Sequence, residues 1–469
     1  MNISHQNSST NQEEHFDSIV IGAGMSGLAA AIRLAMAGQS VTVLEQHSIA
    51  GGLNSYYRRG KRKLDVGLHA MTNFMEQGQK GKPLGKILKQ LRLRYGQLKL
   101  SPQKSSLIHF PNQKLCFSNQ IEKLQADIAQ TFPDQKENFE QLLEFVDHFN
   151  ETDLNHQFIP ASQHLSQIIT DPLLLNMLMT PLLLYGSANQ DEMDLAQFVI
   201  MFKSIYLEGF MRPEGGVRTI IQLLLDRLDS LGVKIRYRTK VQAILKSEEH
   251  VTGVLLQSED VILANKIYSS IGSLESEQLA DLPLRSRPGA LSFVETIFHF
   301  EQRPSDSGAD QTIIFYNDRP KFQYHCPATL FDPSSAVVCF PNNFEQDDGP
   351  EGVIRITFIA NYQLWSKLSK NDYLNAKEQV KMAALATIKQ VAPNFSATPI
   401  FTDTFTPMTI ERYTGHIGGA VYGSPDKWRD GTTELAGLFL TGTDQGFLGI
   451  VGSLLSGISI ANLHGISRD

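Results

Sequence analysis

The feature that most constrains this chain is a glycine-rich turn, Gly22-Ala-Gly24-Met-Ser-Gly27, between an apolar strand and an alanine-rich helix. The strand is expected over 17–21, and the helix runs up to Gly38. A second strand over 40–44 then ends at Glu45, 18 residues after Gly27. Strand, tight turn, helix and acid-ended strand make a βαβ unit of about 30 residues, which is typical of dinucleotide-binding domains.

Each residue type in this unit has a physical role. Gly22 permits the tight turn, Gly24 lets the backbone approach a pyrophosphate, and Gly27 lets helix and strand pack closely. The helix N-terminus offers unpaired N–H groups to phosphates, and Glu45 can accept hydrogen bonds from ribose hydroxyls. We therefore predict a dinucleotide site here; the alternative is an ordinary βαβ unit without ligand.

Composition excludes several other classes of protein. The 469 residues are enough for two or three domains with a large core. The 42 Lys and Arg residues against 49 Asp and Glu give a net charge of −7, which offers no field for binding nucleic acid. The cysteines are three in number and lack C-x-x-C spacing, so neither a disulfide framework nor a metal site is predicted, and a reducing, cytoplasmic compartment is expected. The polar segment 1–14 is predicted to be a disordered leader, and no apolar run is long enough to cross a membrane.

Two later blocks repeat the pattern of strand, glycine turn and helix. The first begins at Arg212-Pro-Glu-Gly215-Gly216, continues as an amphipathic helix over 220–231, and is followed by strands at 233–238 and from Val241 to Ile244. The second is an apolar strand from Gly437 that reaches Gly442-Thr443-Asp444 and leads into a helix of small residues over 450–462. Taken alone, these blocks predict only helices and strands, and Asp444 could be a helix cap.

After Glu45 the chain continues Gln46-His-Ser-Ile-Ala-Gly51-Gly52-Leu53, and here it resembles the FAD-binding flavoproteins that share the amine oxidase and phytoene desaturase fold. Leu53 stands where many members of that group carry Arg. Within the group, the Leu64-Asp65-Val-Gly67-Leu-His69 block and the segment 411–423 are most similar to carotenoid desaturases, carotenoid isomerases and retinol saturases. The resembling stretches cover most of the chain.

The resemblance implies an α/β fold in which a Rossmann-like FAD-binding domain is joined to a discontinuous α+β substrate domain. The FAD-binding domain is expected to combine 15–70, 212–285 and 405–469, and the substrate-binding domain 71–211 and 286–404. In the second domain, helix patterns dominate 84–210, short β-rich runs occupy 290–404, and a long helix is expected over 373–392.

FAD is the cofactor that the resemblance implies. The residues expected to contact it are Gly22, Gly24, Met25, Ser26, Gly27, Glu45, Gln46, Gly51, Gly52, Leu53, Val241, Gly442, Asp444, Gly449, Ile450 and Val451.

The implied activity is an FAD-dependent oxidoreductase acting on carbon–carbon double bonds of an apolar polyene, carotenoid, retinoid or related lipid. Hydride would pass between flavin N5 and the substrate, by desaturation, saturation or cis–trans isomerisation. His69 is the first catalytic candidate because histidine holds or loses a proton near neutral pH, and the alternative is a buried histidine that orients its loop. Tyr422 and Arg412 follow as candidates, with expected roles as a pocket wall and a loop anchor.

Two other functions stay open from sequence. One is an FAD-dependent amine oxidase on a soluble substrate, and the other is a non-catalytic isoprenoid-lipid carrier of the same fold. The apolar run 173–185 is expected to be partly core and partly the lining of a lipid tunnel. A water-insoluble substrate also predicts a peripheral contact with the inner face of a membrane. The electron donor or acceptor is not identified.

Overall fold

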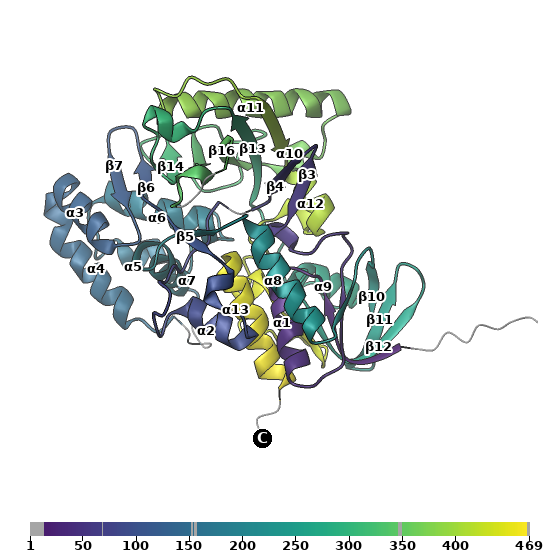
Figure 1. Ribbon diagram of the computed structural model, residues 1–469. Coiled ribbons are helices and arrows are strands. Elements are labelled where there is room, and N and C mark those ends of the chain that lie inside the picture. The colour runs from purple at the N-terminus through teal and green to yellow at the C-terminus, as the bar shows by residue number, and fades with distance from the viewer. Residues whose placement is uncertain (1–13, 68, 152, 154–156, 346–348, 467–469) are drawn as a thin grey trace, which may run out of the picture.

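The computed structural model describes residues 14–67, 69–151, 153, 157–345 and 349–466, which contain two large β-sheets and the helices around them (Figure 1). The predicted α/β class is confirmed by this mixture of sheets and helices. The predicted leader lies outside the described residues except for Glu14, which begins the first strand.

The first sheet has the strand order β10-β11-β12-β1-β2-β9, with β18 beside β12. Strands β9, β2, β1, β12 and β18 run parallel, whereas β10, β11 and β12 form an antiparallel meander. Ile19, Val20 and Val43 are fully buried, as expected for parallel strands covered on both faces. The strands are β1 Glu14–Ile21, β2 Val41–Leu44, β9 Lys234–Arg236, β10 Val241–Ser247, β11 His250–Leu256, β12 Val261–Ser269 and β18 Leu438–Leu440.

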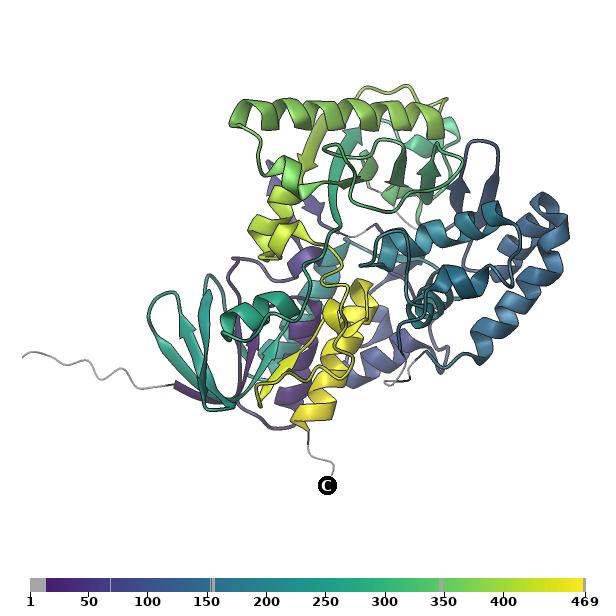
Figure 2. The ribbon, with the colours of Figure 1, turned by 180° about the vertical axis from the view of Figure 1, so that it is seen from behind.

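Helices α1 Met25–Met36, α8 Val217–Ser230 and α13 Gly449–Ile460 pack together on one face of this sheet (Figure 1). The small residues of α13 allow a close crossing with α1, since a Cβ atom on Gly457 would lie 2.0 Å from the Ser26 carbonyl oxygen. Helix α9 Ser273–Leu279 lies toward the other face, and the view from behind shows the meander at the outer end of the sheet (Figure 2).

Helix α2 Pro83–Leu91 packs in the same core as α1 and α13, through Leu84 and Ile87. The sequence predicts that residues 71–211 belong to the substrate-binding domain, whereas α2, within that range, lies against helices α1 and α13. The reason is that the apolar residues on one side of α2 pack against apolar residues of α13.

The second sheet has the order β17-β13-β16-β15-β14-β6-β7, and its pairs are antiparallel except β14 with β6. All nine residues of β13 are buried: helix α11 Lys370–Val391 packs on one face of the strand, and on the other face Glu295 contacts His69 and Ile297 packs with Leu64 and Ile410. The strands are β6 Ser106–His109, β7 Lys114–Phe117, β13 Ser292–Phe300, β14 Ile313–Asn317, β15 Ser335–Cys339, β16 Gly352–Ala360 and β17 Phe401–Phe405.

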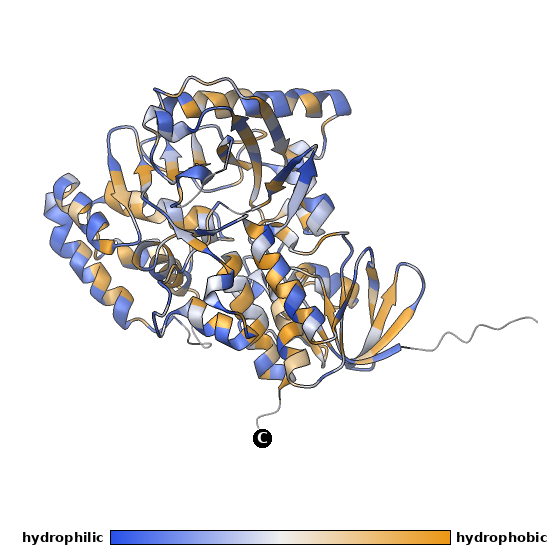
Figure 3. Cartoon of the chain, viewed as in Figure 1, coloured by the Kyte–Doolittle hydropathy of each residue, from blue (hydrophilic) through white to orange (hydrophobic). Residues whose placement is uncertain are grey.

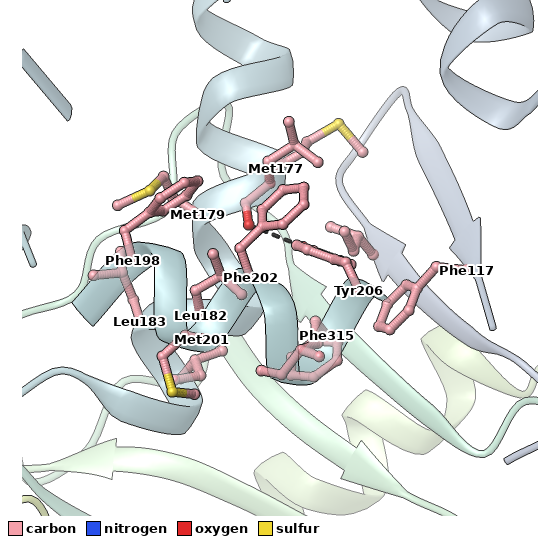
Figure 4. Packing of buried hydrophobic residues seen from close by; sticks show 14 of the residues in the cluster. Phe117, Met177, Met179, Leu182, Leu183, Phe198, Met201, Phe202, Tyr206 and Phe315 are labelled. Carbon is pink, nitrogen blue, oxygen red and sulfur yellow. Dashed lines mark hydrogen bonds between the residues drawn. The ribbon is translucent and has the colours of Figure 1, made fainter. Parts of the chain in front are cut away.

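The helical layer consists of α3 Ile121–Thr131, α4 Lys136–His148, α5 Ala161–Leu165, α6 Pro172–Gly186 and α7 Leu195–Phe202. Helix α6 continues through Pro181, and Asp171 caps its first turn by accepting from the N–H groups of Leu173 and Leu174. The side chains of α6 and α7 interlock with Phe117 and Phe315 of the second sheet (Figure 4). Apolar residues face inward across these elements, while the outer surface of α11 carries many hydrophilic residues (Figure 3).

Shorter elements connect the two sheets. Two antiparallel pairs lie between them, formed by β3 Tyr56–Arg59 with β4 Arg62–Asp65 and by β5 Leu100–Pro102 with β8 Met211–Pro213. Helices α10 Tyr362–Trp365 and α12 Pro407–Thr414 contact each other, and α12 also packs on β13. This connection places loops of both sheets around one central region.

Candidate active site

The glycine-rich turn forms a backbone cradle at the N-terminus of α1. A Cβ atom on Gly27 would lie 2.1 Å from the Gly22 carbonyl oxygen, so the inner side of the turn is closed to any side chain. A Cβ atom on Gly24 would meet no atom within 4 Å, so the outer side is open. The first N–H groups of α1, from Met25 and Ser26 on, begin at this open side. A closed turn below free helix N–H groups fits a pyrophosphate.

Glu45 lies at the end of β2, 8% exposed, with its carboxylate held by two backbone groups. Its Oε2 accepts from the Ala23 N–H at 2.8 Å, and its Oε1 accepts from the His47 N–H at 2.7 Å. A carboxylate has about four lone-pair positions, so each oxygen keeps one for a further donor such as a ribose hydroxyl.

A cavity of about 270 Å³ runs along this edge of the first sheet. The predicted cofactor residues on its wall are Gly22, Gly24, Glu45, Gln46, Gly52 and Val241. The structure therefore brings Val241 of β10 beside the ends of β1 and β2, although Gly22 and Val241 are 219 positions apart in the sequence, as an elongated dinucleotide requires.

Two further wall residues of this cavity, Glu275 and His416, were missed by the sequence analysis as site residues. Their side chains are 3.6 Å apart, and Glu275 also accepts from the Ile417 N–H at 2.8 Å. Burial disfavours a charge on His416, but the hydrogen bond and charge of Glu275 outweigh it and raise the pKa of His416. His416 stands in the segment 411–423 that carried the resemblance, whereas Glu275 has no local sequence signal.

Gly51, Gly52 and Leu53 extend the cradle toward the second sheet. Gly51 has φ of +123°, a value that favours glycine, and forms an isolated bridge with Gly24. A Cβ atom on Gly52 would lie 3.4 Å from the Gly24 Cα. Leu53 in turn lies under the next loop, because a Cβ atom on Gly67 would be 2.6 Å from the Leu53 carbonyl oxygen. These contacts connect the cradle to the loop that carries His69.

Asp444 is 2% exposed and its two oxygens hold two chain segments. Oδ2 accepts from the Ser273 N–H at 2.6 Å, and Oδ1 accepts from the Ser424 N–H at 2.8 Å. The Nζ atom of Lys427 lies 3.9 Å from Oδ1. Through these two hydrogen bonds, Asp444 holds the start of α9 and the loop at Ser424 close to the end of β18. This role is in addition to the cofactor contact predicted for it.

The N-terminus of α13 carries the remaining predicted cofactor residues, Gly449, Ile450 and Val451. No side chain caps this helix end, and a Cβ atom on Gly449 would meet no atom within 4 Å. Gly442 lies beside the cradle, since its Cβ position would be 3.1 Å from the Ser26 hydroxyl. The open helix terminus suits a group on which negative charge develops.

His69 belongs to a buried polar cluster built on strands of the second sheet. Its Nε2 lies 3.0 Å from Glu295 Oε2 and 2.9 Å from the Thr357 hydroxyl. That hydroxyl donates to Glu295 Oε2 at 2.8 Å, and Arg355 Nε donates to Oε1 at 2.7 Å. Glu295 comes from the middle of β13, and Thr357 and Arg355 come from the paired strand β16. We call His69, Glu295, Arg355 and Thr357 the His69 cluster.

A second set of charged residues fixes the backbone of the loop that carries His69. Asp65 accepts from Arg212 at 2.7 Å and from Arg218 at 2.6 Å, and Arg212 also donates to the His69 carbonyl oxygen at 3.3 Å. Arg355 Nη2 donates to the Asp65 carbonyl oxygen at 3.1 Å. The backbone on both sides of Gly67 is therefore fixed by arginines.

The charge state of the cluster follows from burial and from Arg355. Burial favours a neutral Glu295, but the positive charge of Arg355 outweighs it and, with the His69 contact, lowers the pKa of Glu295 to about 2. Burial lowers the pKa of His69, and Arg355 and Arg212 act in the same direction against the opposing effect of Glu295. At neutral pH we therefore treat Glu295 as an anion paired with Arg355 and His69 as a neutral imidazole.

Tyr422 lies near two aromatic residues, Phe293 and Tyr185, that are close to the His69 cluster. Its hydroxyl donates to the Leu184 carbonyl oxygen at the end of α6, and its ring meets Phe293 edge-on at 5.9 Å. Burial raises the pKa of Tyr422, so this hydroxyl stays protonated. Tyr185, the residue after Leu184, lies 6.4 Å from the His69 ring, centroid to centroid. The role of Tyr422 as a wall of the site stays a prediction.

Arg412 lies on the wall of a separate cavity of about 710 Å³, bounded by the β3–β4 hairpin, α12 and the predicted cofactor residues Glu45, Gly52 and Leu53. Its guanidinium is 5.5 Å from the centre of the Tyr413 ring. Among the described residues, no hydrogen bond or ion pair joins Arg412 to the His69 cluster. The structure thus places two of the three catalytic candidates in one region and Arg412 in another.

A cavity of about 600 Å³ opens beside α6 and reaches the residues just before α13. Its wall combines apolar and charged side chains: the apolar residues include Met193, Ile200, Phe447 and Leu448, and the charged ones are Glu151, Asp153, Asp194, Arg287, Asp426, Lys427 and Arg429. Most of α6 is core, so the apolar run 173–185 contributes packing; none of its residues lines this cavity, whose wall on this helix is Gly186.

Two absences hold for the described part of the chain. No group of three or more His, Cys, Asp or Glu side chains there is arranged to hold a metal ion. No helix in the same ranges is long and apolar enough to span a bilayer.

Comparison with known proteins agrees with this geometry. Prolycopene isomerase from Daucus carota is 23% identical and covers 98% of this chain and 81% of its own length. All-trans-retinol 13,14-reductase from Danio rerio is 22% identical, covering 96% of this chain and 86% of its own. The solved structure of an oxidoreductase from Methanosarcina mazei has a TM-score of 0.68 at 16% identity, covering 95% of this chain and 99% of that chain, so the fold is shared.

The family model described as flavin containing amine oxidoreductase matches residues 25–463. This match begins directly after Gly24, spans the rest of the cradle, the His69 cluster and α13, and confirms the resemblance drawn from the sequence. The flavin in the family description agrees with the FAD predicted from the cradle residues, which the backbone around Gly24 fits. The protein is therefore a flavin-dependent oxidoreductase, and the chain belongs to the flavin containing amine oxidoreductase family.

Proposed function

We propose that this protein is an FAD-dependent oxidoreductase that acts on carbon–carbon double bonds of an apolar polyene of the carotenoid or retinoid class. The observation that carries the proposal is the order of three features in space. The cradle at Gly24 and Gly52 leads through Leu53 to the His69 loop, and Tyr185 connects that loop to the end of α6, where the 600 Å³ cavity begins. The names of the carrot isomerase and the zebrafish reductase support this substrate class.

Bound FAD would supply a hydride acceptor or donor. Glu45 and the N-terminus of α1 would hold its adenosine and pyrophosphate portions, and the open N-terminus of α13 would face the part on which reduction places negative charge. The buried aromatic and aliphatic side chains around Tyr422 would exclude water from the reacting carbons.

His69 would handle the proton. Its ring is largely buried, neutral at pH 7 and held by Glu295 and Thr357, so it can take a proton from carbon or return one. Tyr422 would form a wall of the site through its fixed hydroxyl.

The test is conversion by the FAD-loaded enzyme under anaerobic conditions. A panel of carotenoids and retinoids is incubated with oxidised and with prereduced enzyme, and product mass and chromatographic retention are measured. A gain or loss of two hydrogens, or an unchanged mass with a new retention time, supports the proposal and identifies the reaction. Conversion of primary or secondary amines with no conversion of any polyene would overturn it.

A further inference from the structure

We propose that Glu295 is a positioning residue that holds His69 in the tautomer with hydrogen on Nε2, so that Nδ1 is the atom that accepts the substrate proton. The inference deepens the proposed function and rests on it. It assigns a role to a strand residue that has no local sequence motif.

The first step of the argument is the hydrogen-bond pattern at Nε2. Glu295 Oε2 lies 3.0 Å from this nitrogen. An ionised carboxylate only accepts hydrogen bonds, so the contact requires a hydrogen on Nε2. Thr357 agrees with this assignment, because its single hydroxyl hydrogen is used toward Oε2 at 2.8 Å, and its oxygen is then an acceptor for Nε2–H at 2.9 Å.

The second step is that Glu295 stays ionised. Its side chain is 2% exposed and that of Arg355 is 3% exposed. The two opposite charges therefore form a buried ion pair in which each stabilises the other. The two carboxylate oxygens have different partners: Oε1 faces Arg355, and Oε2 faces His69 and Thr357. The low pKa of Glu295 supports this state.

The third step concerns the other charged and titratable groups around the ring. Arg212 from β8 donates to the His69 carbonyl oxygen and is balanced by Asp65 from β4. Cys339 from β15 donates its thiol to the same carbonyl oxygen at 3.6 Å, and burial raises the pKa of this thiol to about 12. Tyr185 from α6 is a protonated phenol, since burial raises its pKa. None of these groups supplies a second carboxylate to the ring.

The fourth step is the position of Nδ1. The described hydrogen bonds of the imidazole all use Nε2, and the side chain keeps 12% exposure. With hydrogen on Nε2 of a neutral ring, Nδ1 carries the free lone pair. In a desaturation, one C–H bond would give hydride to the flavin and the neighbouring C–H bond would give its proton to Nδ1, leaving a new C=C bond; saturation is the reverse.

The test begins with the tautomer itself. FAD-loaded protein with ¹⁵N-labelled histidine is examined by NMR, with His69→Gln used to assign the signal. We expect the wild type to show a neutral ring with hydrogen on Nε2. A hydrogen on Nδ1 in the wild type would overturn the proposal without any activity measurement.

The decisive variant is Glu295→Gln. Because Arg355 has only hydrogen-bond donors, the new amide oxygen would face Arg355. The amide NH₂ would then face Nε2, and a hydrogen bond between them requires Nε2 to be the acceptor. We expect the hydrogen to move to Nδ1, polyene turnover to fall about 10²-fold or more, and the remaining activity to extend to lower pH because the charge that raises the His69 pKa is gone. An unchanged tautomer together with an unchanged pH profile would contradict the proposal.

Two further variants control the experiment. Thr357→Val keeps Glu295, so the wild-type tautomer should persist, and this variant decides the question if Glu295→Gln does not fold. In it, loss of the Nε2–H tautomer would show that Thr357, not Glu295, sets the proton position. Glu277→Gln removes a different buried carboxylate, which accepts from Ser286, and should leave tautomer and pH profile as in the wild type. Absence of polyene turnover in the wild type would refute the proposed function and the role of Nδ1 in it, whereas an NMR result alone decides whether Glu295 sets the tautomer.

Discussion

The carboxylate of Glu45 is expected to carry much of the affinity for the adenosine end of FAD. Its oxygens already hold Ala23 and His47, so it is fixed in place before the ligand binds. Hydrogen bonds to a charged group contribute about 1.5–3 kcal/mol. We therefore predict that Glu45→Ala weakens FAD binding by about 10- to 100-fold, measured by titrating deflavinated protein with FAD.

The matched control for this prediction is Glu248→Ala, which changes an exposed glutamate on the turn after β10. It should bind FAD like the wild type. Equal FAD affinity of the Glu45→Ala variant and the wild type would show that this carboxylate does not contact the cofactor.

Glu295 predicts a particular dependence of stability on pH. Its pKa falls from an ordinary value of 4.5 to about 2 on folding, so the folded state favours the ionised form. The stabilisation that it gives is complete above pH 4.5 and is lost as the pH falls through 4.5 toward 2. In the His69→Gln background, where no imidazole titrates beside it, the difference in unfolding free energy between Glu295 and Glu295→Gln should therefore be constant from pH 7 to about 5 and shrink below that, as measured by urea unfolding. A difference that grows on acidification would refute the ionised state.

At the scale of single residues, the sequence predicted the site residues that lie close together in the chain and missed those that only the folded structure brings together. The cradle and Glu45 lie within one βαβ unit, where spacing alone places the residues together. Glu295 and Arg355 meet His69 from strands more than 200 residues away, and their only signal is a charge inside an apolar strand. Such a charge says that a partner exists but not which residue it is.

Among the secondary-structure elements, the crossing of α1 and α13 is the contact most sensitive to side-chain size. A Cβ atom on Gly457 would lie 2.0 Å from the Ser26 carbonyl oxygen, a backbone atom that cannot move without shifting the cradle. We predict that Gly457→Ala lowers the free energy of unfolding by about 1–3 kcal/mol or more and weakens FAD retention, as measured by urea unfolding and flavin content.

The control for this crossing is Gly96→Ala, since a Cβ atom there would meet nothing within 4 Å. It should leave both quantities unchanged within error. A Gly457→Ala variant as stable as the wild type would mean that the two helices are not in close contact.

Most elements were predictable because their periodicity is strong. Helices α1, α8, α11 and α13 coincide with the expected ranges within a few residues, and strands β13 to β16 lie within 290–404, where short β-rich runs are expected. Helix α6 continues through Pro181, with its C-terminal half packed in the core, although proline ordinarily breaks or kinks a helix. Helix α2 lies with the first sheet because tertiary packing, which no local pattern encodes, decides where a short amphipathic helix docks.

On the scale of the whole molecule, the mouth of the 600 Å³ cavity is the expected place of contact with a lipid surface. Phe158 lines this cavity and is 55% exposed, and the adjacent Ile159 is 40% exposed. Burying two such side chains in a membrane contributes about 1.5–3 kcal/mol each. We predict that the double change Phe158→Ser and Ile159→Ser reduces sedimentation with phosphatidylcholine–phosphatidylglycerol vesicles by at least about tenfold.

The matched control replaces two exposed apolar residues on the far helix α11, Leu374 and Met382, by serine. Vesicle binding of this control should equal that of the wild type. If the wild type itself does not sediment with the vesicles, the expected peripheral contact is wrong.

The most direct test of the whole account compares polyene turnover in the wild type and in His69→Gln, both loaded to the same FAD content. Because His69 lies where the cradle, the Glu295 carboxylate and the route to the cavity meet, the account predicts that the wild type converts a carotenoid or retinoid and that His69→Gln is slower by about 10²- to 10⁴-fold. Product mass and retention measure both rates. Equal turnover by the two proteins would contradict the account, since the proton would then be handled without His69.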